Sequence, residues 1–122
     1  RALEAAYADA VRRHDALGMI ATNREFHVAV AEAGGNLYFT QLFARLLDEG
    51  RRVLRLYYHS FDDALPRRYV DEHSDMVAAI EAGDADRADA LAAAHAAQIV
   101  RQIQAYMARD TASGIDLSGK TK

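Results

Sequence analysis

Residues 16–33 read ALGMIATNREFHVAVAEA, and this stretch predicts a long amphipathic helix. Its inward candidates recur near the 3.6-residue period of a helix, and they are Ile20, Phe26, Val30 and Ala31. Asp15 stands directly before the stretch as an N-cap residue. Gly34 follows it, as is common where a helix ends, because glycine accepts the left-handed conformation.

Four further segments, at about 2–14, 36–58, 66–83 and 84–110, show the same periodicity. No segment shows the alternation that is typical of a strand. We therefore predict one all-α domain over residues 1–110, an antiparallel bundle of about five to six helices with a metal site in its core. Residues 111–122 are rich in Ser, Gly, Thr and Lys without periodicity, which predicts a disordered tail.

The segment 36–58 is predicted to be one continuous helix. Its apolar stripe consists of Phe39, Leu42, Phe43, Leu46, Val53, Leu54 and Tyr57. We expect these side chains to face the core.

Composition limits the function classes that are open to the chain. With 122 residues there is room for one domain with a modest core. The net charge of −3 leaves no excess of basic residues for binding nucleic acid, so we do not expect this part of a protein to contact DNA itself. The absence of cysteine excludes disulfides, cysteine-ligated zinc and thiol catalysis. Without a membrane-length apolar run or a signal-peptide pattern, we expect a cytoplasmic location and no membrane partner.

Three of the five histidines fall at inward positions on three different predicted helices. They are His27, His73 and His95, and Asn23 lies one turn before His27, where two side chains share a helix face. Any one of these residues alone is more often a packing or surface residue, but four that can converge predict a metal site. Neutral imidazole and an amide oxygen favour a divalent ion, with zinc first and nickel or manganese as alternatives.

The four predicted ligands are all neutral, so a bound ion would keep its charge and one or two open coordination positions. Such a site should attract an anion, most simply the carboxylate of a small organic acid. Arginines follow one another on the predicted 36–58 helix, and guanidinium pairs with carboxylate through two hydrogen bonds. Arg52 is our first candidate for binding the acid and Arg55 the second, with the Tyr57 hydroxyl as a further contact.

Two other functions remain open on these residues. A metal-dependent hydrolase would use metal-activated water, but no carboxylate is spaced beside the histidines as a general base. Glu25 and Glu72 adjoin predicted ligands in the sequence, and we expect both to point to other faces. In a metal-free helical dimerisation module the histidines would only pack. We do not expect an enzyme.

Several motifs occur together in an order and at spacings found in a known family. They are Asn23-Arg24-Glu25-Phe26-His27, then AEAGGN at 31–36, then DEH at 71–73 with AAIEAGD at 78–84, and Ala88 with His95 seven residues on. Over about residues 2–108 the chain resembles the FCD domain. That domain is the C-terminal effector-binding domain of FadR-type transcription regulators in the GntR family.

The resemblance implies a helical bundle that binds a divalent metal through Asn23, His27, His73 and His95, with a small organic acid at or beside the ion. Occupancy would change the disposition of an N-terminal winged-helix DNA-binding domain, usually in a homodimer. The first ligand is often Asp in the family, and Asn23 removes that charge, which should strengthen the attraction of an anionic effector. The DNA-binding domain and the first helix of the family's bundle are expected to be missing here, so DNA would be bound only through that missing domain.

Overall fold

The computed structural model describes the backbone of residues 1–114 and the side chains of residues 1–109, and this part of the chain forms six α-helices and no strand. The helices are α1 (Ala2–Arg12), α2 (Ala16–Ala33), α3 (Leu37–Glu49), α4 (Arg51–His59), α5 (Arg67–Glu81) and α6 (Ala85–Gly114). The predicted all-α fold is confirmed. Helix α6 continues past the predicted domain end at residue 110, and the rest of the predicted tail, residues 115–122, lies outside the described residues.

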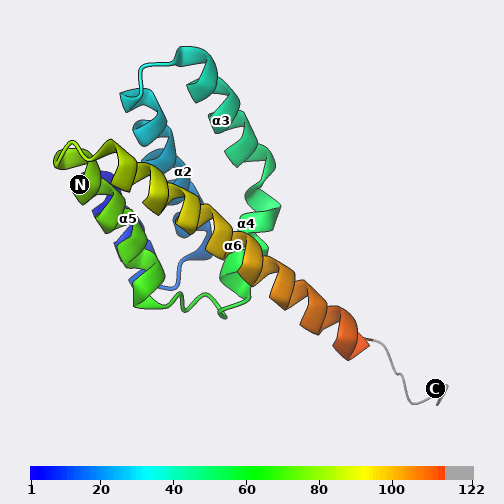
Figure 1. Cartoon of the computed structure of the whole chain (residues 1–122). Helices are drawn as coiled ribbons and strands as arrows, with labels where there is room; N and C mark the ends of the chain where they lie inside the picture. The colour runs from blue at the N-terminus through cyan, green and yellow to red at the C-terminus, as the bar shows by residue number, and fades with distance from the viewer. Residues whose placement is uncertain (115–122) are drawn as a thin grey trace, which may run out of the picture.

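Helices that follow each other in the chain pack as neighbours: α1 on α2, α2 on α3, and α5 on α6. In Figure 1, α6 crosses the bundle diagonally and its C-terminal half extends beyond the other helices, whereas α3 leans away from it. Further contacts join α1 to α5, α2 to α4 and α4 to α6. None of the helices in the described part of the chain is long and apolar enough to cross a membrane.

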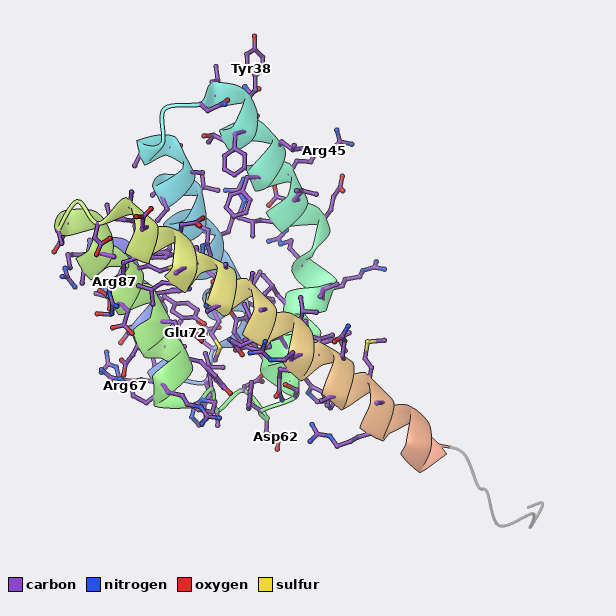
Figure 2. All side chains as sticks on the ribbon, in the orientation of Figure 1. Tyr38, Arg45, Asp62, Arg67, Glu72 and Arg87 are labelled. Atoms are coloured by element: carbon purple, nitrogen blue, oxygen red, sulfur yellow. The ribbon has the colours of Figure 1, made fainter. Side chains whose placement is uncertain are left out.

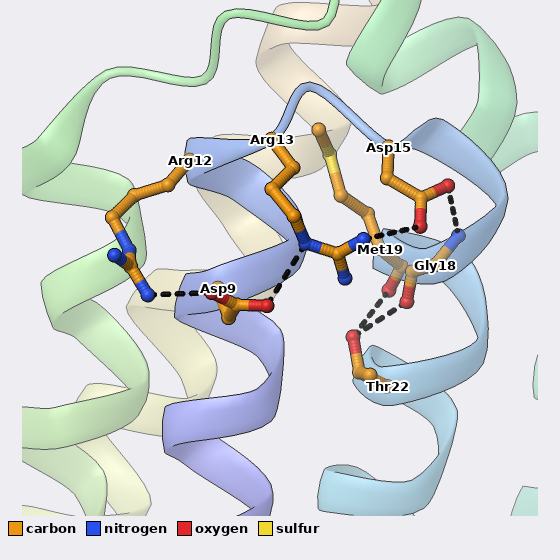
Figure 3. A network of polar contacts seen from close by, with 7 residues as sticks. All are labelled: Asp9, Arg12, Arg13, Asp15, Gly18, Met19 and Thr22. Carbon is orange, nitrogen blue, oxygen red and sulfur yellow. Dashed lines mark hydrogen bonds and ion pairs between the residues drawn. The ribbon is translucent and has the colours of Figure 1, made fainter.

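The connection between α1 and α2 is fixed by side-chain hydrogen bonds (Figure 3). Asp15 caps α2 as predicted, because its Oδ1 accepts a hydrogen bond of 2.9 Å from the backbone N–H of Gly18. On α1, the Asp9 carboxylate accepts hydrogen bonds from Arg12 at 2.6 Å and from Arg13 at 2.9 Å. The start of α2 is thus set by one carboxylate.

The apolar core lies among α1, α2, α4 and α5. Its buried members are Tyr7, Ala10, Val11, Met19, Ile20, Tyr57, Tyr58, Leu65 and Val70. Tyr7, on α1, and Tyr58, on α4, also meet through their hydroxyl groups, whose oxygens are 3.3 Å apart. Of the inward candidates predicted in residues 16–33, Ile20, Phe26 and Ala31 are buried and Val30 is half-buried.

The segment 36–58 is two helices, so the prediction of one continuous helix is wrong. Gly50 ends α3 with φ −84° and ψ 7°, and its N–H donates to the Leu46 carbonyl at 2.9 Å. Glycine is the weakest helix former apart from proline, because its backbone is the freest.

The apolar stripe predicted on this segment is only partly buried. Phe39, Leu42, Leu46 and Val53 keep about half of their surface exposed (53%, 58%, 56% and 49%), while Tyr57 is buried. Helical periodicity identifies an apolar face but does not determine what covers it. Here α6 does not cover α3, and cavities lie between them.

Candidate metal centre

Three histidine side chains from three helices meet inside the bundle. His27 lies on α2, His73 on α5 and His95 on α6, and one ring nitrogen from each lies within 4.8 Å of the other two. The ring centroids are 4.9 Å apart for His27 and His73, 5.0 Å for His73 and His95, and 5.3 Å for His27 and His95. The convergence that helical periodicity predicts is therefore present in the fold.

The cluster contains buried polar atoms without partners. Both ring nitrogens of His73 and Nε2 of His95 are buried, and none of the three has a hydrogen-bond partner among the described residues. An unsatisfied buried polar group costs about 1–3 kcal/mol. A divalent ion between the rings would use one nitrogen of each, and three imidazoles are a donor set that suits zinc. The residues present therefore fit a metal ion.

Burial also keeps two of the rings in the protonation state that binds metal. Burial, with a smaller contribution from the charge of His95, lowers the pKa of His27 to about 4. Burial, followed by the charges of His27 and His95, lowers the pKa of His73 to about 2. Metals bind the neutral imidazole, so neither ring has to lose a proton at neutral pH before binding.

Aromatic side chains fix the orientation of His73, the most buried of the three rings. The ring of Phe26, on α2, stacks on the His73 ring with a centroid distance of 4.3 Å and an interplanar angle of 11°. The Tyr7 ring lies 4.5 Å away at 37°. These contacts leave the imidazole little rotational freedom.

Glu72 lies beside the cluster, and our expectation that it points to another face is wrong. Its Oε2 lies 3.3 Å from Nδ1 of His95, and its Oε1 is buried without a partner among the described residues. Figure 2 labels Glu72 beside α5, on the side towards α6. A carboxylate at Nδ1 favours the tautomer with the proton on that nitrogen, which leaves the Nε2 lone pair free for a metal.

The helical period of α5 places Glu72 about 100° around the axis from His73, which is why the sequence predicts that it points to another face. The glutamate side chain spans the remaining distance because α6 packs directly on α5. Gln98, one turn after His95 on α6, was likewise not predicted, and its buried Oε1 has no partner in the described structure.

Asn23 is buried on α2 and lies at one of two cavities beside the histidines. The first cavity, of about 330 Å³, is lined by Asn23, His27 and His95 together with apolar residues of α3, α4 and α6. The second, also of about 330 Å³, shares His27 and His95 and extends along α3 towards Phe39. The structure thus brings Asn23 to the same cavity as two of the histidines. Its role as the fourth ligand stays a prediction.

The residues predicted to bind an acid line neither cavity. Arg52 is exposed, and the Arg55 guanidinium donates to Oδ1 of Asp63 at 2.8 Å. Tyr57 is buried and its hydroxyl accepts a hydrogen bond of 2.7 Å from Nε2 of Gln98. Burial raises the pKa of that hydroxyl. Contact of Arg52, Arg55 or Tyr57 with an acid stays a prediction that this geometry does not favour.

The family model of the FCD domain matches residues 1–98, which include all three clustered histidines. No curated protein and no solved structure matches the chain. FCD domains are parts of transcription regulators. The motifs, the six-helix fold and the family match agree, and the chain belongs to the FCD domain family.

Proposed function

We propose that this chain is the ligand-sensing domain of a FadR-type transcription regulator of the GntR family, and that it binds a divalent metal ion. The convergence of His27, His73 and His95, with buried nitrogens that lack partners, is the observation that carries this proposal. Asn23 is the proposed fourth ligand. Zinc is the first candidate, ahead of nickel and manganese, and the proposed location is the cytoplasm.

The second part of the proposal is a small organic acid held at the metal. When bound, the ion supplies a positive centre that the neutral side chains of Asn23 and the histidines do not compensate. The cavities beside His27 and His95 provide space for the rest of the acid. Binding would change DNA binding by an N-terminal winged-helix domain of the parent protein, provided that the acid prefers one conformation over the other.

A homodimer is the proposed assembly. Large apolar side chains on α3 are exposed, and Tyr38, 84% exposed, points away from the bundle in Figure 2. Exposed apolar patches on small proteins often mark contact sites. Sedimentation equilibrium should give twice the mass of the chain.

Elemental analysis of untagged protein, purified without a metal column, tests the proposed function. We expect about one divalent ion per chain, and native mass spectrometry should detect a co-purified acid. Protein that holds no metal, even after zinc and manganese are added back, would contradict the sensor and leave a helical dimerisation module.

A metal-dependent hydrolase is the second candidate, and the carboxylate of Glu72 beside His95 is the observation in its favour. Hydrolases of this kind need a general base near the metal. Oε2 of Glu72 is, however, engaged with Nδ1 of His95, which is the arrangement of an orienting carboxylate. Turnover of esters or phosphates by the metal-loaded protein, lost in Glu72→Gln, would favour the hydrolase.

A further inference from the structure

We infer that the acid of this sensor is a monocarboxylate with an apolar chain, and that dicarboxylates are rejected. The inference rests on the proposed metal site and specifies which acid that site takes. Its basis is the chemical character of the two cavities that adjoin His27 and His95.

The two cavities are almost entirely apolar. They share His27, Phe43, His95 and Ala96, so they adjoin each other along α3. Within the described residues, the polar side chains are His27 and His95 in both linings and Asn23 in the first alone, and no Asp, Glu, Lys or Arg lines either one. Carbon side chains form the remaining walls, among them Phe39, Phe43, Leu46, Val53, Met76 and Ile99.

A second carboxylate on the ligand would find no partner in these cavities. Arg55 is paired with Asp63, and Arg52 lies outside both linings. Moving a second carboxylate from water onto carbon walls that offer it no cation and no hydrogen-bond donor weakens binding. The carboxylate of Glu72, 3.3 Å from His95, already places one negative charge beside the cluster and opposes another.

The space available suits an acyl chain. Each cavity measures about 330 Å³, within the range that small-molecule sites occupy. Each methylene buried against carbon walls should raise the affinity about three- to fourfold. Affinity should therefore increase from acetate through butyrate to hexanoate.

Isothermal titration of the zinc-loaded protein with acetate, butyrate, hexanoate and succinate tests the inference. We expect hexanoate to bind about tenfold more tightly than butyrate. Succinate, which differs from butyrate by its second carboxylate, should bind at least about tenfold more weakly than butyrate. Succinate that binds as tightly as butyrate, or hexanoate that binds no better than acetate, would overturn the inference.

Two leucines of α3 provide a matched pair of variants. Leu46 lines the first cavity, whereas Leu42 lines neither, and their exposures are nearly equal at 56% and 58%. Leu46→Arg places a cation at the cavity wall and should strengthen succinate binding relative to butyrate. Leu42→Arg adds the same charge one turn away and should leave the ratio unchanged. If the ratio of succinate affinity to butyrate affinity is the same in both variants, the first cavity is not where the acid binds.

Arg52→Ala separates the inference from the alternative that an arginine holds the acid. A loss of about tenfold in butyrate affinity with zinc retained would overturn the apolar assignment. Other results would contradict the proposed function itself. If the protein holds no zinc, or holds zinc but binds no carboxylate, both the acid sensor and this inference are wrong. If the protein prefers succinate, only this inference is wrong.

Discussion

His73 is the residue on which the proposed site most depends. Its side chain has no exposed surface, and its two ring nitrogens face no hydrogen-bond partner among the described residues. A leucine would fill such a position without the cost of unsatisfied polar atoms. The arrangement becomes favourable when one nitrogen binds an ion, and the rings of Phe26 and Tyr7 then hold the imidazole in place.

Glu72→Gln tests the orienting role of the carboxylate beside His95. The amide can still accept a hydrogen bond but carries no charge, so it favours the required tautomer less. We expect zinc affinity to fall about 10- to 100-fold in a chelator competition assay, and the absorption spectrum of the cobalt-loaded protein to change. Glu25→Gln, at the exposed glutamate that precedes Phe26 on α2, is the matched control and should change neither. An unaltered Glu72→Gln protein would rule this role out.

Proton release on metal binding tests the depressed pKa values of His27 and His73. Three ordinary histidines would be protonated at about pH 5 and would release about three protons per ion bound. With pKa values of about 4 and about 2, His27 and His73 are already largely neutral at that pH. We therefore expect at most about one proton per zinc ion, measured by calorimetry in buffers of different ionisation enthalpy. A release near three protons would show that the rings are protonated like exposed histidines.

The lowered pKa values of His27 and His73 also change the expected pH dependence of metal binding. From the sequence, metal affinity should fall as the pH drops through about 6.5, which is that ordinary value. The sequence does not show how deeply each imidazole is buried. The structure moves competition by protons at His27 and His73 to lower pH, because burial lowers the pKa of both rings.

At the scale of helices, the sequence predicts well which face of a helix is apolar, and poorly which other helix packs on that face. The 3.6-residue period identified His27, His73 and His95 because each shares a face with apolar neighbours that are conventional core residues. The same reasoning on α3 predicted a buried stripe, yet Leu42 and Leu46 are more than half exposed. Which helix covers a face depends on tertiary packing, and the period carries no information about it.

Asp15→Ala tests how the N-cap of α2 supports the site. Removing the hydrogen bond to the Gly18 N–H should lower the free energy of unfolding by about 1 kcal/mol in urea titrations. Zinc stoichiometry should stay the same, because the cap stabilises the helix and touches no proposed ligand. Asp75→Ala, an exposed carboxylate inside α5, is the control and should cause no loss. Equal stability of the two variants would mean that the cap contributes nothing measurable.

At the scale of the whole molecule, the histidine cluster joins helices that are distant in the sequence. His27 belongs to the pair of α1 and α2, whereas His73 and His95 belong to the pair of α5 and α6. An ion bound by all three would tie the two pairs together in the folded state only. Metal binding should therefore add to the free energy of unfolding, by about 2.7 kcal/mol when free metal is 100 times the Kd.

The stability of the metal-free protein should depend on pH in a specific direction. The folded-state pKa values of His27 and His73 lie below the ordinary value of about 6.5, so the unfolded chain takes up more protons as the pH falls. Stability is then complete above about pH 6.5 and is lost progressively towards the folded pKa values. Between about pH 7.5 and 5.5 we expect a loss of about 1–3 kcal/mol, measured by urea unfolding with chelator present. Constant stability over this range would contradict the burial of neutral rings.

Zinc stoichiometry of His73→Ala beside His59→Ala is the most direct test of the central claim. His59 is exposed at the end of α4 and lies outside the cluster, so its variant controls for the loss of any histidine. By equilibrium dialysis and elemental analysis, we expect about one zinc ion per chain in the wild type and in His59→Ala. His73→Ala should keep its helical circular dichroism and bind no zinc at the same free concentration. Wild-type stoichiometry and affinity in His73→Ala would contradict a metal centre built on these three histidines.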